Sequence, residues 1–186
     1  RIDNGVLQFA IFYVISDFKE YGKHYLFHKI RPLWELHSMH HSADKLTILT
    51  ATRFHFLESA LGTFFNILPL VLLGAPIQTF FAISILGMAH GFMVHSNLEH
   101  DWGFIGKYII VSPAAHRIHH CAEERHYDKN FGGMVIFWDR LFGTYHPAEE
   151  VAVIGIPNNP YNKKGFAYDI IAPIGRMFGI RKKHTQ

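Results

Sequence analysis

SALGTFFNILPLVLLGAPIQTFFAISILGMAHGFMVHSNL, residues 59–98, runs for forty positions without an Asp, Glu, Lys or Arg. A helix of this length measures about 60 Å, twice the roughly 30 Å thickness of the hydrocarbon core of a bilayer. Gly74, Ala75 and Pro76 interrupt the run near its middle, and such a sequence is typical of a turn. The run therefore predicts a membrane-spanning helical hairpin with legs over residues 56–73 and 77–98. A buried hairpin of a soluble protein is the alternative interpretation.

A second apolar stretch, residues 5–16, precedes the hairpin and continues without a helix breaker into Asp17 and Tyr21. Twelve residues are too few to cross a bilayer, so we expect one long helix that crosses it and extends into water. Basic residues follow this helix and flank the hairpin on both sides. If the hairpin crosses the membrane and returns, these residues all lie on one side of it, which the positive-inside rule assigns to the cytoplasm. We expect an all-α integral membrane bundle with a histidine-rich cytosolic cap. It forms a single domain over residues 1–186, with a cytosolic tail over 147–186.

The composition narrows the classes of function. A net charge of +3 is too small to indicate nucleic-acid binding, and the pI near 9.0 is read as contact with anionic lipid headgroups. Cys121 is the only cysteine, which excludes an intrachain disulfide framework, a Cys-rich zinc fold and an iron–sulfur cluster. Histidine is the outlier, at 15 of 186 residues. The chemistry of this chain is therefore expected to use imidazole.

Two histidine triplets share the spacing His-x-x-His-His. They are His37, His40 and His41, and His116, His119 and His120. On a helix, positions i, i+3 and i+4 lie on one face, so each triplet offers three nitrogens to one metal or divides them between two. Arg31-Pro32 and Ser112-Pro113 precede the triplets and are typical of helix starts.

His24 and His28 form a further pair at helical spacing, with Asp17 and Tyr21 on the same stripe. We expect the pair to bind metal, and we expect Asp17 and Tyr21 to accept a ring N–H and fix its tautomer. The remaining histidines are less regular. His95, and with less support His100, are candidate ligands near the end of the second leg. His90 is expected to be an interior histidine, His55 has a substrate-side or a structural role, and His126, His146 and His184 are treated as ordinary.

A spanning hairpin returns His95 and the second triplet to the face that carries the other histidines. Eight or nine imidazoles are too many for one tetrahedral zinc and suit two metals. Imidazole binds zinc, copper, iron and nickel, so the ligands alone do not choose the metal. The Glu-x-x-His pattern of carboxylate-rich di-iron bundles is absent, as is the His-Glu-x-x-His helix of zinc proteases.

Together these motifs resemble those of the bacterial branch of the fatty acid hydroxylase / sterol desaturase superfamily, which comprises integral membrane di-iron oxygenases. The resemblance covers residues 17–146, and no single motif carries it. The matching segments are DFKEYGKHYLFH (17–28), LWELHSMHHS (33–42), TRFH (52–55), HSNL (95–98), SPAAHRIHH (112–120), DKNFGG (128–133) and WDRLFGT (138–144).

The resemblance implies two Fe ions held by histidines, O₂ as co-substrate and an external electron-transfer protein as donor. The reaction it implies is hydroxylation or desaturation of a membrane lipid at the cytoplasmic face, here of a bacterial inner membrane. The carried-over ligands are His24, His28, His37, His40, His41, His95, His116, His119 and His120, with His100 as a further candidate. Asn97 is expected to approach the metal through water or to hold His95 in place. Some members have a closer-spaced pair where His95 and His100 are five apart.

The lipid, an acyl, sterol, ether-lipid or carotenoid chain, is expected to enter a cleft between the hairpin and the first helix. Phe64, Phe65, Phe80 and Phe81 either line this cleft or face lipid. Electrons come from outside, because the sequence has no dinucleotide fingerprint or haem-attachment motif. Two alternatives stay open: a non-catalytic metal-binding subunit of a larger membrane complex, and a hydrolase with a histidine-bound zinc pair.

Overall fold

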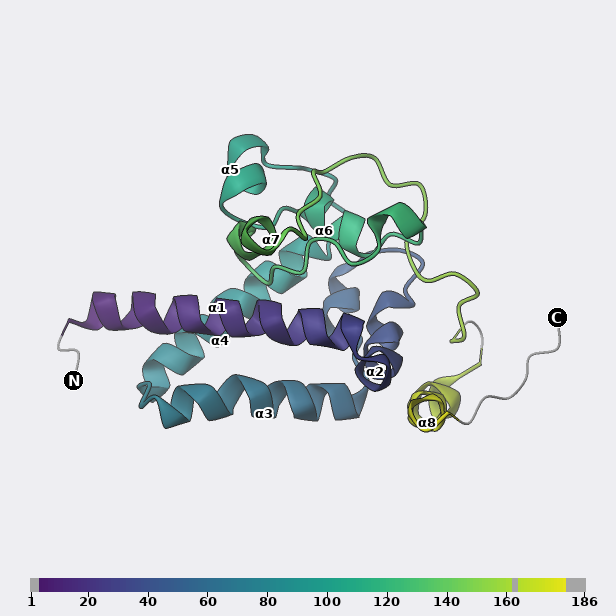
Figure 1. Cartoon of the computed structure of the whole chain (residues 1–186), viewed down its shortest axis with the longest axis horizontal. Helices are drawn as coiled ribbons and strands as arrows, with labels where there is room; N and C mark the ends of the chain where they lie inside the picture. The colour runs from purple at the N-terminus through teal and green to yellow at the C-terminus, as the bar shows by residue number, and fades with distance from the viewer. Residues whose placement is uncertain (1–3, 162–163, 180–186) are drawn as a thin grey trace.

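The computed structural model describes residues 4–161 and 164–179. Within these residues the chain is helical, and its only β contacts are two isolated bridges, Ile110–Val135 and Cys121–Ile154. Three long helices, α1 (Gly5–Lys29), α3 (Phe56–Leu72) and α4 (Ile77–Val94), lie beside a region of short helices and loops (Figure 1). The fold is all-α, as the sequence predicted. His184 lies outside the described residues.

Helix α1 is continuous through Asp17 and Tyr21, as predicted. The side chain of Asn4 caps its first turn by accepting backbone N–H groups, which have no partner inside a helix. The helix ends at Lys29 because the backbone of Ile30 is extended, and α2 (Arg31–His41) begins directly after it with Pro32 in its first turn. The two helices are packed together, which brings their histidines face to face.

Helices α3 and α4 meet at the predicted turn, where Gly74 takes a positive φ of 72°, a conformation that glycine adopts without strain. They diverge from the turn, with α1 beside them (Figure 1). Helix α4 has 18 residues and is apolar enough to cross a membrane, whereas α3 is shorter, with 17 residues and Pro69 near its end. Helix α4 also ends at Val94, four residues before the predicted end at 98, because His95 caps it.

The second triplet lies on α6 (Pro113–His119) and its C-cap, His120, and the N-cap Ser112 accepts the backbone N–H of Ala115. A loop over residues 128–134 follows and is anchored by Asp139 of α7 (Phe137–Phe142). The Asp139 carboxylate accepts the N–H groups of Phe131 and Gly132, each at 2.7 Å. A Cβ on Gly132 would lie 2.6 Å from the Val135 carbonyl oxygen, so this close approach requires glycine.

The described part of the expected cytosolic tail, residues 147–161 and 164–179, contacts the histidine-bearing helix α2. Helix α8 (Phe166–Met177) packs against α2, where Arg176 Nε donates to Glu35 at 2.7 Å. Ser38 Oγ lies 2.9 Å from Tyr161 Oη. His55 is buried, caps α3 and contacts the Ile170 carbonyl oxygen at 2.9 Å. These contacts resolve the two readings of His55 in favour of a structural role.

Candidate metal centre

Nine histidines gather in two adjacent groups, and in each group one ring nitrogen from every residue lies within 4.8 Å of those of the others. The first group is His24, His28, His37, His41 and His119; the second group is His40, His95, His116 and His120. The groups are adjacent, since the stacked rings of His41 and His120 have centroids 4.2 Å apart. All nine carried-over histidines therefore converge, although they come from residues as far apart as 24 and 120.

Helical spacing explains how each triplet serves both groups. On α2, His37 and His41 are one turn apart and face the first group, while His40 on the neighbouring stripe faces the second. On α6 the division is reversed: His116 and His120 face the second group and His119 faces the first. Of the two arrangements that the sequence left open, each triplet adopts the divided one.

In the first group, acceptors from the rest of the fold fix the proton of three rings on Nδ1. His24 Nδ1 donates to the Phe131 carbonyl at 2.9 Å, His119 Nδ1 to the Lys129 carbonyl at 2.8 Å, and His37 Nδ1 to Glu58 Oε1 at 2.5 Å. In the neutral ring, Nε2 then carries a bare lone pair. These three Nε2 atoms are buried and have no hydrogen-bond partner. Converging lone pairs without a proton between them fit a bound cation.

In the second group, the distances between the ring nitrogens also fit a bound cation. His95 Nε2 lies 3.0 Å from His40 Nε2 and 2.9 Å from His116 Nε2, and His116 Nε2 lies 3.2 Å from His120 Nε2. Two nitrogens bound at right angles to one ion, each at about 2.1 Å, lie about 3.0 Å apart. Imidazoles without carboxylates suit first-row transition metals and not magnesium or calcium.

Burial keeps these rings neutral. It holds the pKa values of six rings well below the ordinary 6.5 because a charged ring would lose its hydration, and neighbouring histidines add to the shift. The six are His37, His40, His41, His116, His119 and His120. The pKa of His28 is lowered by burial too, but Asp128 opposes the shift from 3.6 Å. In turn, the nearby His28 ring and the ammonium of Lys29, which donates to Asp128 at 2.5 Å, lower the pKa of Asp128 to about 2. At neutral pH the lone pairs are therefore free to bind a metal.

Two predicted site residues lie elsewhere. His100 is exposed, and its Nδ1 accepts the backbone N–H of Trp102 at 2.9 Å, outside both groups. Asn97 is also exposed and its Oδ1 accepts from Arg117 at 3.5 Å. His95 is held instead by the Gly91 carbonyl, at 2.7 Å from its Nδ1. The hydrogen bond that holds His95 thus comes from Gly91 and not from Asn97, and an approach of Asn97 to a metal through water stays a prediction.

Asp17 and Tyr21 are buried beside the site, but neither accepts a ring N–H, so that expectation is wrong. Asp17 accepts the backbone N–H of Met134 at 3.0 Å and the indole N–H of Trp138 at 2.8 Å. Tyr21 Oη lies 3.0 Å from Thr144 Oγ1. Both side chains thus fix the segment around the 128–134 loop, whose carbonyl groups orient histidines. They therefore support the site indirectly, through this segment, and not through a direct contact with a histidine ring.

The acceptors that do orient rings were missed by sequence reasoning. Glu58 lies one residue before the uncharged run, and this was the only available signal, since a carboxylate at the mouth of an apolar helix needs a partner. The backbone carbonyls of Phe131 and Lys129 give no sequence signal. His90 is buried outside both groups, as expected. His126 is fully buried between Cys121 Sγ at 3.0 Å and Glu149 Oε1 at 2.8 Å, a link between loops.

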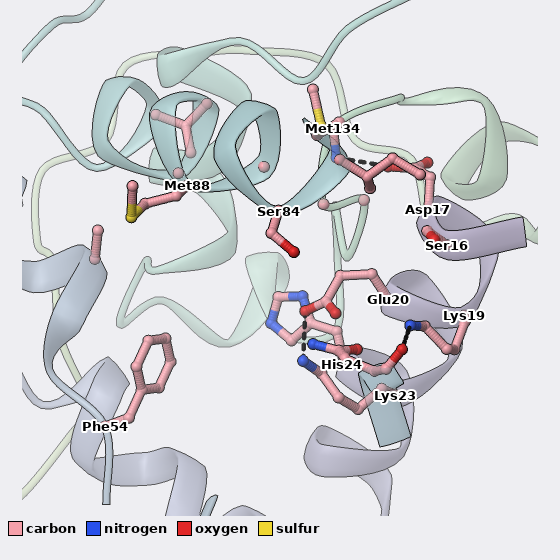
Figure 2. Close-up of a pocket in the computed structure, with 18 of the residues that line it drawn as sticks. Ser16, Asp17, Lys19, Glu20, Lys23, His24, Phe54, Ser84, Met88 and Met134 are labelled. Atoms are coloured by element: carbon pink, nitrogen blue, oxygen red, sulfur yellow. Dashed lines mark hydrogen bonds and ion pairs between the residues drawn. The ribbon is translucent and has the colours of Figure 1, made fainter. Parts of the chain in front are cut away.

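A cavity of about 450 Å³ lies between α1, α3 and α4 and reaches both groups, as the predicted cleft required. Five histidines line it: His24, His37, His40, His95 and His116. Figure 2 shows His24 beside Glu20 and Lys23, with Phe54 and Met88 across the pocket. Of the four phenylalanines considered, Phe80 lines the cavity. The other three, Phe64, Phe65 and Phe81, are about half exposed on the outer surface.

Comparison with known proteins gives one family. Residues 9–144 match the fatty acid hydroxylase family model. Ornithine lipid hydroxylase of Rhizobium tropici is 33% identical over 165 residues, which are 88% of this chain and 49% of that protein. Human alkylglycerol monooxygenase is 30% identical over 147 residues, 78% of this chain and 32% of the relative. Tobacco Delta(7)-sterol-C5(6)-desaturase is 32% identical over 153 residues, which are 79% of this chain and 53% of that protein.

The chain thus spans about half the length, or less, of these relatives. No solved structure matches it significantly.

Proposed function

The chain belongs to the fatty acid hydroxylase family, as its histidine motifs indicated, and we propose that it is an O₂-dependent lipid hydroxylase or desaturase with two iron ions. The observation that carries the proposal is the pair of histidine groups: nine converging imidazoles beside one cavity. The names of the relatives, a lipid hydroxylase, a monooxygenase and a sterol desaturase, support an oxidation of lipid C–H bonds. The ornithine lipid named for the first relative is the first substrate class to test.

The roles of the residues follow from the geometry. The nine histidines would hold the irons, and iron bound there supplies the activation of O₂. Glu58, Asp128 and the carbonyls of Phe131, Lys129 and Gly91 orient the rings toward the ions. The cavity presents a lipid C–H bond to the histidine face and keeps bulk water away from it. The electrons come from an external electron-transfer protein.

We place the chain in the membrane with the histidine groups at the cytoplasmic face, in a bacterial inner membrane. Helix α4 is long and apolar enough to cross, and only 11% of it is buried inside the fold. Large apolar side chains are exposed along all three long helices; examples are Val6, Val14, Phe64, Leu72, Phe81 and Ile85. Lipid around these helices would cover a surface that water does not favour. A spanning hairpin of α3 and α4 is part of this proposal.

The test combines metal analysis with lipid analysis. The purified chain is expected to contain about two irons, and lipids of a host that expresses it are expected to gain one oxygen from ¹⁸O₂ or lose two hydrogens. A His40→Ala variant is the control, since it removes a ligand candidate of the second group and should lower both signals. Unchanged host lipids with intact metal would favour a non-catalytic subunit. Turnover without O₂ by a zinc-containing chain would favour a hydrolase.

A further inference from the structure

Helix α8 is amphipathic, but its apolar face points away from the fold. Ala167, Ile171, Ile174 and Phe178 follow one another at intervals of four, three and four residues, so they share one face. The side chain of Ile171 is 68% exposed and that of Phe178 is 76% exposed. A helix on the surface of a water-soluble domain has the opposite arrangement, with its apolar residues toward the core and its charged residues outward. The outer face of α8 therefore fits an apolar partner.

The charged residues of α8 itself lie on its inner face, toward α2. Arg176 Nε donates to Glu35 Oε2 at 2.7 Å, and Arg176 Nη2 donates to the Tyr161 hydroxyl oxygen at 2.6 Å. Asp169 and Pro173 share this face at helical spacing; Pro173 is buried, and so is Asp169 Oδ1. Polar contacts thus hold α8 to α2, and the described residues leave its apolar stripe uncovered.

The position of α8 matches the cytoplasmic boundary of the proposed membrane region. His55 caps the start of α3, and its Nε2 donates to the Ile170 carbonyl oxygen of α8 at 2.9 Å. The next residue of α3, Phe56, is exposed. Figure 1 shows α8 end-on, whereas α1 and α3 run across the picture. A helix that runs across the direction of the spanning helices, at their cytoplasmic end, lies in the plane of the membrane surface.

The charge of this part of the sequence indicates which partner covers the stripe. From residue 164 onward, five basic residues stand against one acidic residue, Asp169. The five are Lys164, Arg176, Arg181, Lys182 and Lys183, of which the last three lie outside the described residues. The cytoplasmic leaflet of a membrane is anionic and attracts basic segments. Two copies of the same basic segment would repel each other, so an anionic lipid surface fits this face better than a second copy of the chain.

We propose that α8 lies on the cytoplasmic leaflet of the membrane, with Ile171 and Phe178 in contact with acyl chains and Lys164 at anionic headgroups. Because α8 packs against α2, which carries the first histidine triplet, this contact holds the metal centre close to the membrane surface. The inference rests on the membrane placement in the proposed function, and it adds a membrane contact that the long helices do not provide.

Nitroxide labels on single introduced cysteines test this contact in the full-length chain. Cys121, the native cysteine, is buried and should not react with the label. The labelled Ile171→Cys variant is reconstituted into bilayers of phosphatidylcholine and phosphatidylglycerol. We expect the label to collide with O₂, which dissolves well in hydrocarbon, and to be protected from a water-soluble nickel chelate. Glu124→Cys, at an exposed position of the histidine-bearing region, is the control in water, and Ile85→Cys, on the exposed side of α4, is the control in hydrocarbon.

The two accessibilities separate the possible results. Nickel access at position 171 with protection at position 85 would overturn the inference and leave the membrane placement standing. Nickel access at both positions would overturn the membrane placement itself. Protection of position 171 from both nickel and O₂ would mean that protein covers the stripe, either a second copy or another segment of a longer chain, and would also overturn the inference.

Lipid charge gives a second measurement. In bilayers of phosphatidylcholine alone, nickel access at position 171 should rise, because the headgroups then carry no net charge. Lys164→Gln in the anionic bilayers should raise it too, by weakening the attraction of α8 to the surface about fivefold. Lys45→Gln, at an exposed position outside α8, is the matched control and should change nothing. Nickel access that is the same with and without phosphatidylglycerol would overturn the assignment of an anionic surface.

Discussion

The two histidine groups are built from the same residue type and both draw on α2 and the α6 region, with α1 added in the first group and the end of α4 in the second, yet they are supported differently. In the first group, three rings donate from Nδ1 to acceptors outside the centre, and Asp128 lies 3.6 Å from the Nδ1 of a fourth. In the second group only His95 has such an acceptor; the Nδ1 atoms of His40, His116 and His120 are buried without a partner. Hydrogen bonds therefore orient one group. The other relies on packing, such as the Phe54 ring stacked 4.5 Å from that of His40.

The groups also differ in ligand number and in access. The first has five histidines, of which two line the cavity; the second has four, of which three line it. A group with fewer protein ligands leaves more coordination positions for small molecules, and open positions are typical of catalytic metals. The comparison suggests a division of labour, in which the first group mainly holds its metal and the second presents its metal to the cavity.

Removal of one ligand should give the largest effect and should differ between the groups. His40→Ala leaves three nitrogens in the second group, while His41→Ala leaves four in the first. We expect His40→Ala to lose about one of two metal ions and to lower activity by more than the roughly 100-fold seen when only a supporting residue is removed. His41→Ala should keep more metal. Elemental analysis of the purified variants measures both.

His100→Ala is the matched control for these variants, because His100 is exposed and lies outside both groups. It should keep its metal content. Equal metal loss in His40→Ala and His41→Ala would show that the extra ligand of the first group adds nothing, and the division of labour would fail.

The sequence predicts those features of this centre that join residues close together in the chain and misses those that join distant ones. The nine converging histidines follow from helical spacing and one hairpin, which are local patterns, and the family motifs resolve their roles. The contacts of Glu58 with His37 and of Phe131 with His24 join residues 21 and 107 positions apart, and no spacing rule links them. Asp17 and Tyr21 failed as predicted partners for the same reason: they lie on the correct stripe, but distant residues bind them instead, Met134 and Trp138 for Asp17 and Thr144 for Tyr21.

Loss of an orienting acceptor should give a smaller effect, confined to the first group. Glu58→Ala removes the carboxylate that fixes His37 Nδ1 and should weaken metal binding there by about 10- to 100-fold, with the second metal unchanged. Chelator competition that resolves two metals per chain measures this. Glu58→Gln keeps an acceptor oxygen and should retain most of the affinity. Equal weakening of both metals in Glu58→Ala would mean that the two groups are not supported separately.

Acid sensitivity of the metal-free chain should be the smallest effect per residue, and here the two groups should behave alike. Burial lowers the pKa values of His41 and His120 well below 6.5, so below pH 6.5 the unfolded chain binds protons that the folded chain rejects. The stability is therefore complete above pH 6.5 and is lost as the pH falls further, by at most about 1.4 kcal/mol per pH unit for each ring. His41→Ala and His120→Ala should reduce this slope equally, whereas His28→Ala should reduce it less, because Asp128 opposes the shift of His28. Thermal unfolding between pH 7.5 and 5.5, followed by tryptophan fluorescence, gives the slope of stability against pH for each variant. Different slopes for His41→Ala and His120→Ala would mean that the two groups differ in ring protonation and not in their orienting hydrogen bonds.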